Sequence, residues 1–288
     1  MNPWILAARP KTLWASVAPV AMGTAMAYRD GHFDVLTLVL TLAGALLIQV
    51  GTNYCNDYAD FAKGTDTGAR LGPLRATQAG LVTPAAMKRA TIIVFALAAL
   101  VAGALVARGG WPVVAVGVTS IASGVLYTAG PRPLGYLGLG DVFTLVFFGP
   151  VAVAGTYYLQ ALSLPARAVV AGLGPGLLSV AILTINNLRD LEGDAKAGKR
   201  TLPVRFGATF ARWEYTVCII AAGLVPIFLV GRYGAPPNSA VAAMIILAGV
   251  PAIRSVWGRA EAATLNRLLA FTALLLLAYS MMFSIGWI

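Results

Sequence analysis

The sequence predicts an all-α protein, a polytopic membrane bundle of nine transmembrane helices with two long cytoplasmic loops on one face. Of its 288 residues, 59% are hydrophobic and 11% are charged, and the mean hydropathy is +0.79. Soluble domains carry about a quarter charged residues. The apolar residues here form repeated runs close to the ~20 residues that span a bilayer. These observations exclude a soluble globular domain.

The predicted helices follow directly from the apolar runs. They cover 12–28, 35–52, 91–107, 112–128, 141–161, 167–187, 214–230, 240–256 and 268–288. The sequence shows neither a low-complexity tail nor a separate soluble domain. Residues 1–288 are therefore expected to form a single transmembrane domain.

The basic residues orient these helices. The net charge of +10 could also suit a nucleic-acid partner, but its distribution favours a membrane environment. Of 21 Lys and Arg residues, only Arg29, Arg108, Arg167 and Arg232 fall on one side of the nine-helix map. The positive-inside rule places the other side in the cytoplasm, with the N-terminus inside and the C-terminus outside. We therefore expect a multi-pass protein of the cell (inner or plasma) membrane, with the lipid bilayer and no nucleic acid as a partner.

Carboxylates are scarce and concentrate in two short segments at the ends of apolar runs. The chain has 11 Asp and Glu residues, and the two segments are 53–60 and 186–194. In each segment an Asn precedes the first Asp by four residues, and the two segments are separated by four predicted helices. Both are therefore expected on the cytoplasmic face, each followed by a long polar loop, about 62–90 and 192–212. Acids at a membrane edge are costly and are usually retained for function.

The spacing predicts a shared metal site. Residues separated by four and by seven or eight positions share one face of a helix. The two sets expected to face each other are Asn53, Asp57 and Asp60, and Asn186, Asp190 and Asp194. Carboxylates completed by water and substrate phosphates are the environment that Mg²⁺ prefers. Nearby cations suited to the remaining phosphate oxygens are Lys63, Lys196, Lys199 and Arg200.

Three alternatives to a metal site account for less of this pattern. Any helix that leaves a membrane becomes polar, which suffices for Glu192 and Glu214 but not for two repeated segments. An ion-coupled transporter would also carry paired acids, although its site is usually near the bilayer midplane on broken helices. A purely structural subunit does not account for the clustering of acids.

The same residues carry a family resemblance over essentially the whole chain. The two acidic segments resemble the aspartate-rich motifs of the UbiA-type intramembrane prenyltransferases. Further matching stretches are Arg9–Thr12, NYCNDYADFAKGTD (53–66), YTAGPRPLGYLGLGDVFTLVFFGPVAVAGTYYLQ (127–160) and NNLRDLEGDAKAGKRTLPVRFG (186–207). Together these are similar to the 1,4-dihydroxy-2-naphthoate polyprenyltransferase branch, which acts in menaquinone synthesis.

The resemblance implies an Mg²⁺-dependent enzyme. It would transfer a polyprenyl group from polyprenyl diphosphate to 1,4-dihydroxy-2-naphthoate, releasing CO₂ and diphosphate and giving demethylmenaquinone. The implied alternatives are other aromatic acceptors, 4-hydroxybenzoate or homogentisate. The family pattern often has a further acid at the position of Gly64, whereas here Asp66 follows two residues later.

The resemblance also assigns roles to residues. The implied metal ligands are Asp57, Asp60, Asp66, Asp190 and Asp194. The implied catalytic groups are Asp57, Asp60, Asp190, Asp194 and Lys199. The implied substrate-binding residues are Asn53, Asn56, Lys63, Arg75, Arg132, Tyr136, Asn186, Asn187 and Arg200. For the acceptor carboxylate Arg132 is the first choice, with Tyr136 nearby and Arg75 or Gln78 as alternatives. The candidates for stabilising an allylic cation are Tyr127, Phe147, Phe148 and Tyr157, although aromatic residues at helix interfaces more often serve packing alone.

Overall fold

The computed structural model describes residues 2–64, 71–72 and 74–288, and these form an all-helical bundle. The chain begins with α1 (Pro3–Ala8), η1 (Pro10–Thr12), α2 (Trp14–Arg29), α3 (Val35–Ala62), α4 (Pro84–Gly109), α5 (Trp111–Leu126) and α6 (Gly140–Phe148). It continues with α7 (Pro150–Ala161), α8 (Ala166–Arg189), α9 (Leu191–Lys196), α10 (Leu202–Tyr233), η2 (Pro237–Met244), α11 (Ile245–Trp257) and α12 (Ala262–Trp287).

Every predicted apolar run is helical, although not every helix reaches membrane length. In the described part of the chain, seven helical stretches are long and apolar enough to cross a membrane. The runs predicted at 12–28 and 112–128 form α2 and α5, each of 16 residues, so the count of nine spans remains a prediction. The protein is thus a multi-pass, all-α membrane protein.

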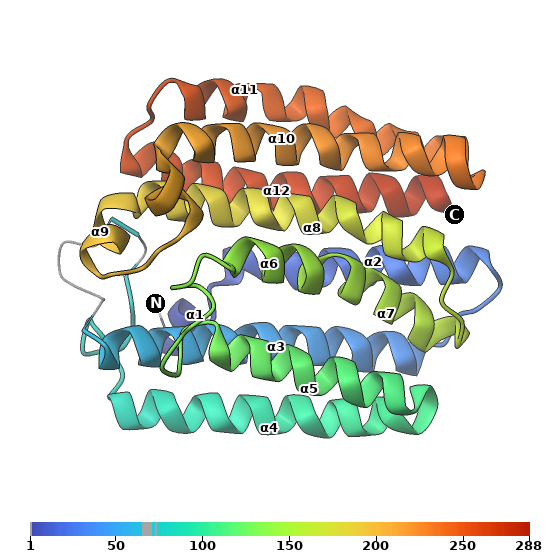
Figure 1. The fold of residues 1–288 in the computed structure, drawn as a ribbon. Coiled ribbons are helices and arrows are strands. Elements are labelled where there is room, and N and C mark those ends of the chain that lie inside the picture. Colours follow the sequence, from blue (N-terminus) through green and yellow to red (C-terminus); the bar gives the residue numbers. More distant parts are fainter. Residues whose placement is uncertain (1, 65–70, 73) are drawn as a thin grey trace.

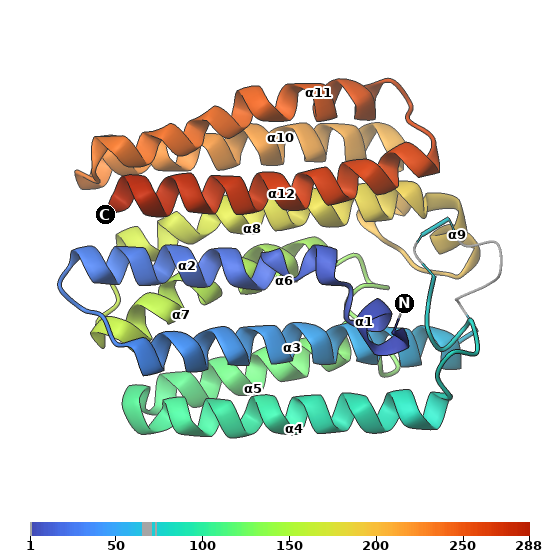
Figure 2. The same cartoon turned by 180° about the vertical axis from the view of Figure 1, so that it is seen from behind.

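The helices lie side by side with their axes along one direction (Figures 1 and 2). α3, α4 and α5 form one side of the bundle, and α10 and α11 form the other. The main hydrophobic core joins α2, α7, α8, α10, α11 and α12. α8 is central to it, with 72% of its most apolar stretch buried, against 17% for α3 and α4. The side that contains α3, α4 and α5 is therefore packed less fully.

Several helix boundaries differ from the prediction and shape one end of the bundle. α3 continues to Ala62, so the whole first acidic segment is helical. α8 instead ends at Arg189, and the rest of the second segment lies on the short α9. The predicted run 141–161 is broken at Gly149, where the backbone passes so close to α8 that an added Cβ would lie 2.6 Å from the Gly172 carbonyl oxygen. The loop predicted over 192–212 is largely helical, since α10 already begins at Leu202.

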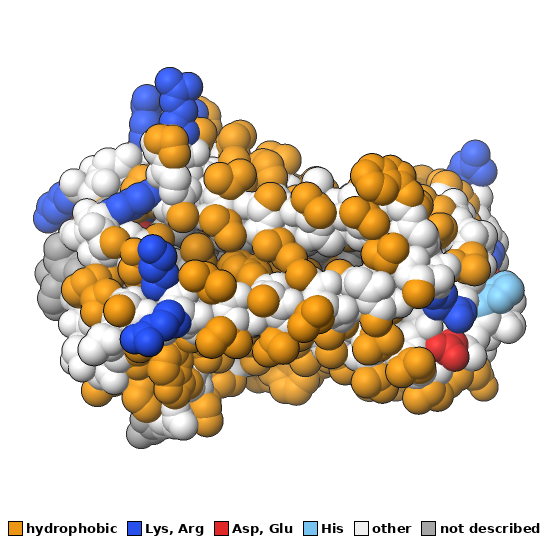
Figure 3. Space-filling view, turned by 90° about the horizontal axis from the view of Figure 1, so that it is seen from below, with side chains coloured by type: hydrophobic (Ala, Val, Ile, Leu, Met, Phe, Trp, Pro, Cys, Tyr) orange, Lys and Arg blue, Asp and Glu red, His pale blue; other side chains and the backbone are white. Residues whose placement is uncertain are grey.

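The molecular surface agrees with a membrane environment. Figure 3 shows hydrophobic side chains along the length of the bundle and most of the visible Lys and Arg side chains gathered towards one end. Large exposed apolar residues such as Leu100, Trp111 and Leu247 are expected where lipid replaces water as the solvent. The basic end is also the end that holds both acidic segments.

Candidate active site

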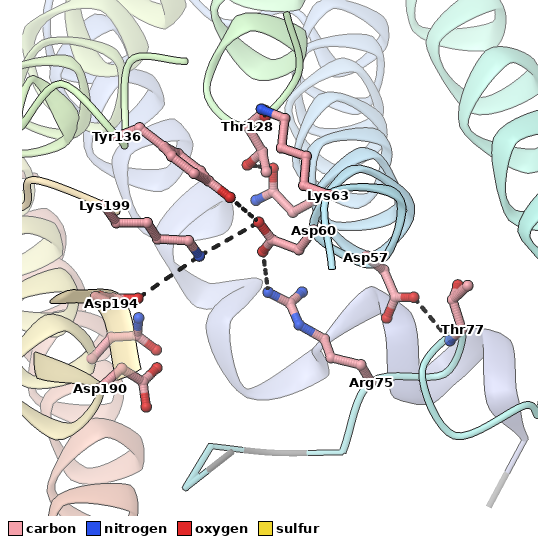
Figure 4. Close-up of polar contacts among 12 residues, drawn as sticks. Asp57, Asp60, Lys63, Arg75, Thr77, Thr128, Tyr136, Asp190, Asp194 and Lys199 are labelled. Carbon is pink, nitrogen blue, oxygen red and sulfur yellow. Dashed lines mark hydrogen bonds and ion pairs between the residues drawn. The ribbon is translucent and has the colours of Figure 1, made fainter. Parts of the chain in front are cut away.

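The two acidic segments meet through one lysine. Lys199 Nζ lies 3.4 Å from Asp60 Oδ1 and 3.8 Å from Asp194 Oδ1 (Figure 4). Asp60 comes from the end of α3, and Asp194 comes from α9, 134 positions later in the chain. As the sequence predicted, the two segments lie at the same end of the bundle and face a common space.

Asp60 is the most heavily bonded carboxylate of the first segment. Arg75 Nη2 donates to its Oδ2 at 3.0 Å, and the Tyr136 hydroxyl donates to its Oδ1 at 3.1 Å. Its side chain is only 4% exposed, and that of Arg75 is 7% exposed. A buried carboxylate needs such partners because an unpaired charge away from water is strongly destabilising. Asp60 is therefore held in a fixed position before any substrate arrives.

Asp57 has a different environment from the one its spacing predicted. Its two oxygens accept hydrogen bonds from the backbone N–H groups of Ala76 and Thr77, at 3.0 and 2.9 Å. Figure 4 shows its carboxylate directed towards Thr77 and away from Asp60. The prediction that Asn53, Asp57 and Asp60 all line one face is thus wrong for Asp57. Here its carboxylate satisfies backbone donors of the segment between α3 and α4.

In the second segment, an arginine holds the first aspartate. Arg189 Nε and Nη2 donate to the two oxygens of Asp190 at 2.8 and 2.6 Å, a bidentate charge-assisted pair. Arg189 also donates to Asn186 Oδ1 and, from Nη1, to Asn266 Oδ1, each at 2.8 Å. Asn266 in turn donates to the Leu71 carbonyl at 3.1 Å. Through Asn266, the start of α12 is thus hydrogen-bonded both to Arg189 of the second segment and to the chain that follows the first segment.

Tyr136 separates two lysines at the mouth of the site. Lys63 Nζ lies 4.6 Å and Lys199 Nζ 5.1 Å from the centroid of its ring, distances typical of cation–π contacts. Lys63 also donates to the carbonyl oxygens of Thr128 and Gly130. Burial lowers the pKa of Lys63, Asp60 opposes that shift, and the nearby charge of Lys199 lowers it further. Thr128 bonds to Asn56, which places that predicted residue in the same network.

A cavity of about 1340 Å³ opens from this cluster into the bundle. The predicted site residues on its wall are Asn53, Asn56, Asp60, Lys63, Arg75, Tyr136, Asn186, Asn187, Asp190, Asp194 and Lys199. Arg132 and Arg200 are exposed and do not line it. Asp66 lies outside the described residues. Most of the predicted set is therefore brought together.

Three residues of this region were not identified from the sequence. Arg189 could have been suspected, because it is a basic residue immediately before an acid at the end of an apolar run. Arg9 lines the cavity with a left-handed backbone (φ 54°), which is uncommon for a residue other than glycine and frequent at functional sites. Asn266 gives no sequence signal, since it is a polar residue just before the last predicted apolar run.

The donor set suits a hard divalent cation. Carboxylate and amide oxygens from two helix ends face the same space, and Lys199 shows that a positive charge can bridge Asp60 and Asp194. Among the described residues, no three Asp, Glu, His or Cys side chains lie close enough together to form an all-protein metal cage. Mg²⁺ commonly binds through only one or two carboxylates, with water and substrate phosphates completing its coordination. The residues therefore fit a metal that arrives with a phosphorylated substrate.

Three of the four aromatic candidates line the cavity, and the fourth does not. Tyr127, Phe147 and Phe148 line the cavity. The Tyr157 hydroxyl instead donates to Asp30 at 2.5 Å, and Arg167 forms an ion pair with the same carboxylate at 2.6 Å. Tyr157 therefore belongs to a polar cluster at the opposite end and is removed from the candidate site.

Comparison with known proteins agrees with this geometry. Residues 16–275 match the model of the UbiA prenyltransferase family. The chain is 44% identical to the 1,4-dihydroxy-2-naphthoate octaprenyltransferase of Escherichia coli, covering 77% of this chain and 74% of that protein. It is 41% identical to the protein of the same name from Mycobacterium tuberculosis, covering 78% and 77%.

Solved structures show the same fold at low sequence identity. A UbiA homolog from Archaeoglobus fulgidus bound to DMAPP and Mg²⁺ superposes with a TM-score of 0.68 at 16% identity, covering 98% of this chain and 99% of that one. The apo structure of a UbiA homolog from Aeropyrum pernix gives 0.66 at 20% identity, covering 94% and 96%. The match over most of the sequence and the shared architecture lead to one conclusion: this chain belongs to the UbiA prenyltransferase family.

Proposed function

We propose that the protein transfers a polyprenyl group from polyprenyl diphosphate to 1,4-dihydroxy-2-naphthoate, with loss of CO₂ and diphosphate. The product is a prenylated naphthalene diol of the demethylmenaquinone type. The observation that carries this proposal is the junction of Asp60, Lys199 and Asp194 at the mouth of a long, mainly apolar cavity. The naphthoate acceptor is supported by the 40–44% identity to enzymes that are named for it.

The polar end of the cavity is suited to hold a diphosphate. Asp60, Asp190 and Asp194 would hold Mg²⁺, and the family resemblance adds Asp66, which lies outside the described residues. Bound Mg²⁺ supplies Lewis-acid stabilisation of the negative charge that develops on the leaving diphosphate. Lys199 and Lys63 lie next to Asp60 and supply positive charge for the phosphate oxygens, in positions fixed by the Tyr136 ring.

The apolar part of the cavity protects the reacting carbon. When the allylic C–O bond breaks, both of its electrons leave with the diphosphate, and the allylic cation must meet the acceptor ring before it meets water. Tyr127, Phe147 and Phe148 place electron-rich faces on the wall, where they exclude water and stabilise positive charge. The acceptor then forms the new C–C bond at its carboxylate-bearing carbon and loses CO₂. The prenyl tail lies along the apolar wall.

The acceptor carboxylate requires a cation on the cavity wall. Arg132 was the first choice from the sequence, but its exposed side chain lies outside the cavity lining. Arg75, the alternative, is buried and lines the cavity. We therefore favour Arg75 for this role, and normal acceptor affinity in Arg75→Lys would argue against it, because a lysine cannot reproduce a bidentate guanidinium pair.

The finer membrane placement is part of this proposal. α2 and α5 would complete nine spans if the bilayer is locally thin or the helices are flanked by polar anchors. The basic residues support a cytoplasmic N-terminus and a site that opens to the cytoplasm from the cell membrane. The two substrates would then reach the site from different phases: the prenyl donor from the bilayer and the naphthoate from water.

The decisive experiment uses the full chain in membranes or detergent. The protein is incubated with Mg²⁺, a radiolabelled polyprenyl diphosphate and one of three acceptors: the naphthoate, 4-hydroxybenzoate or homogentisate. We expect a prenylated product and CO₂ release with the naphthoate alone, and loss of product when EDTA removes the metal. Product with 4-hydroxybenzoate instead would reassign the acceptor. Absence of transfer together with diphosphate-independent ion flux in vesicles would favour a transporter.

A further inference from the structure

The lining of the cavity includes small residues on several helices, among them Gly44, Ala102 and Gly155. Along α3 the lining residues recur every three or four positions from Asp60 back to Thr41, so one stripe of that helix faces the cavity throughout. The nineteen residue-to-residue steps from Thr41 to Asp60 correspond to about 28 Å of helix. The cavity therefore extends almost through the ~30 Å hydrocarbon core of a bilayer.

Gly155 lies on the α7 wall close to the deep end. Gln160, five residues further along α7, bonds through Oε1 to the Asp34 N–H just before α3, so these helix ends are level with each other. α3 and α7 run in opposite directions, and Gly155 is therefore roughly level with Thr41. A Cβ added at Gly155 would meet no atom within 4 Å. This glycine faces open space inside the cavity, although no turn or unusual φ angle requires one there.

Beyond Gly155 the cavity reaches exposed apolar residues. Its lining continues to Leu164 and Val169, whose exposed fractions are 60% and 38%. Both residues combine high exposure with a place in the cavity lining, which is the arrangement expected where the space beside Gly155 meets the lipid-facing surface. A long chain that has filled the enclosed part can leave through this opening.

We infer that Gly155 determines which donor chain lengths are accepted, because the prenyl tail passes over it on its way from the enclosed cavity to the lipid. This inference rests on the proposed function. An isoprene unit places four C–C bonds of about 1.5 Å along the chain and extends about 5 Å. About five units therefore fit between the Asp60 cluster and Gly155. Donors of up to four units stop short of Gly155, whereas an eight-unit donor must cross it.

The test compares two glycine substitutions. Gly155→Phe fills the passage, and Gly103→Phe is the matched control: Gly103 lies on the membrane-length α4, is exposed, does not line the cavity, and also has no atom within 4 Å of an added Cβ. For each full-length protein, kcat/KM is measured with a three-unit and an eight-unit prenyl diphosphate and the same acceptor. The readout is the ratio of the two values.

We expect Gly155→Phe to lower the eight-unit to three-unit ratio by about 10- to 100-fold, since a bulky group in filled space forces the occupant to rearrange. Gly103→Phe should leave the ratio unchanged. In Gly155→Phe, the eight-unit donor should also become a weaker competitor of the three-unit donor. Gly155→Leu places a smaller side chain in the passage and should give an intermediate ratio. If Gly155→Phe is too unstable to purify, the ratio measured for Gly155→Leu tests the inference instead.

An unchanged ratio in an active Gly155→Phe or Gly155→Leu protein would overturn the inference and leave the proposed function intact. An equal fall of the ratio in Gly103→Phe would also overturn it, because the effect would then not depend on the cavity. Failure of the unmodified protein to transfer either donor would instead reject the proposed function itself.

Discussion

The two acidic segments have nearly the same sequence pattern but different structural surroundings. The first lies on the unbroken α3, and its carboxylates are bonded to the segment that follows, through Ala76, Thr77 and Arg75. The second is divided between the end of α8 and α9 and depends on Arg189. The side chains of Asp190 and Asp194 are 14% and 13% exposed, against 4% for Asp60. The first segment is therefore a preformed wall, and the second is the half that remains open to substrate.

Small differences in sequence account for this contrast. The position before the first aspartate is Asn56 in one segment and Arg189 in the other. Only the arginine donates two hydrogen bonds to the carboxylate of the aspartate that follows it. The second acids follow at spacings of three and four residues, so they leave the helix in different directions. A duplicated motif can thus give one rigid half and one accessible half.

The largest expected effect on turnover comes from Asp60 in the first acidic segment. Asp60→Asn should lower turnover by about 10³-fold, because it removes charge that supports several kcal/mol of transition-state stabilisation. The measurement is kcat at saturating donor, acceptor and Mg²⁺. Glu192→Gln, an exposed acid on α9, serves as the control and should retain wild-type turnover. Comparable losses in the two variants would mean that turnover depends on the total negative charge near the mouth and not on Asp60 in particular.

In the second acidic segment, the next largest effect is expected from Arg189, which holds Asp190. Arg189→Gln should weaken Mg²⁺ activation by about 10- to 100-fold, as is typical when a residue that orients a metal ligand is removed. The concentration of Mg²⁺ that gives half-maximal rate is the readout, together with direct Mg²⁺ binding by calorimetry. Asn266→Ala should shift both in the same direction but less, and the exposed Asn238→Ala should shift neither. If Asn266→Ala altered only thermal stability, its role would be confined to packing.

A substitution at Asp57 distinguishes a structural role of this carboxylate from a role in metal binding. Asp57→Asn should destabilise the protein by about 1–3 kcal/mol, because a neutral amide cannot accept both buried N–H groups as the carboxylate does. This is measured as a lowered thermal unfolding midpoint in detergent, alongside turnover. A variant with an unchanged midpoint but abolished turnover would show that the carboxylate turns towards the metal when substrate binds.

The smallest expected effect lies at the opposite end of the bundle. Asp34 caps α3 by accepting from the Thr37 N–H at 2.7 Å, and hydrogen bonding from Thr37 lowers the pKa of its carboxyl. A carboxyl with a lowered folded-state pKa stabilises the fold above its unfolded pKa of about 3.9 and loses that contribution as the pH falls further. Asp34→Ala should therefore lower the unfolding midpoint slightly at pH 7, and the difference should shrink below about pH 4. Turnover at pH 7 should be unaffected, in contrast to the two acidic segments.

Much of the site could be predicted because its signals are local. Apolar runs of membrane length located the helices. Scarce carboxylates at the ends of these runs located the site, because an acid beside lipid is costly and is usually retained for function. The prediction that Asn186, Asp190 and Asp194 share one helix face was wrong, because α8 ends at Arg189 and Asp194 lies on the separate helix α9. The inward direction assigned to Asp57 was wrong for a related reason: backbone donors of a distant turn compete for its oxygens.

The sequence by itself determined that this is a multi-pass helical membrane protein of the UbiA prenyltransferase family with two acidic segments at one end. The family followed from the resemblance of the quoted motifs, whereas hydrophobic length and local spacing located the helices and the acidic segments, because these signals act within one helix or one turn. Only the tertiary structure decided which acids face the cavity, that Asn266 supports Arg189, and that the cavity runs as far as Gly155. These features depend on side chains that are far apart in the chain and meet only when the helices pack.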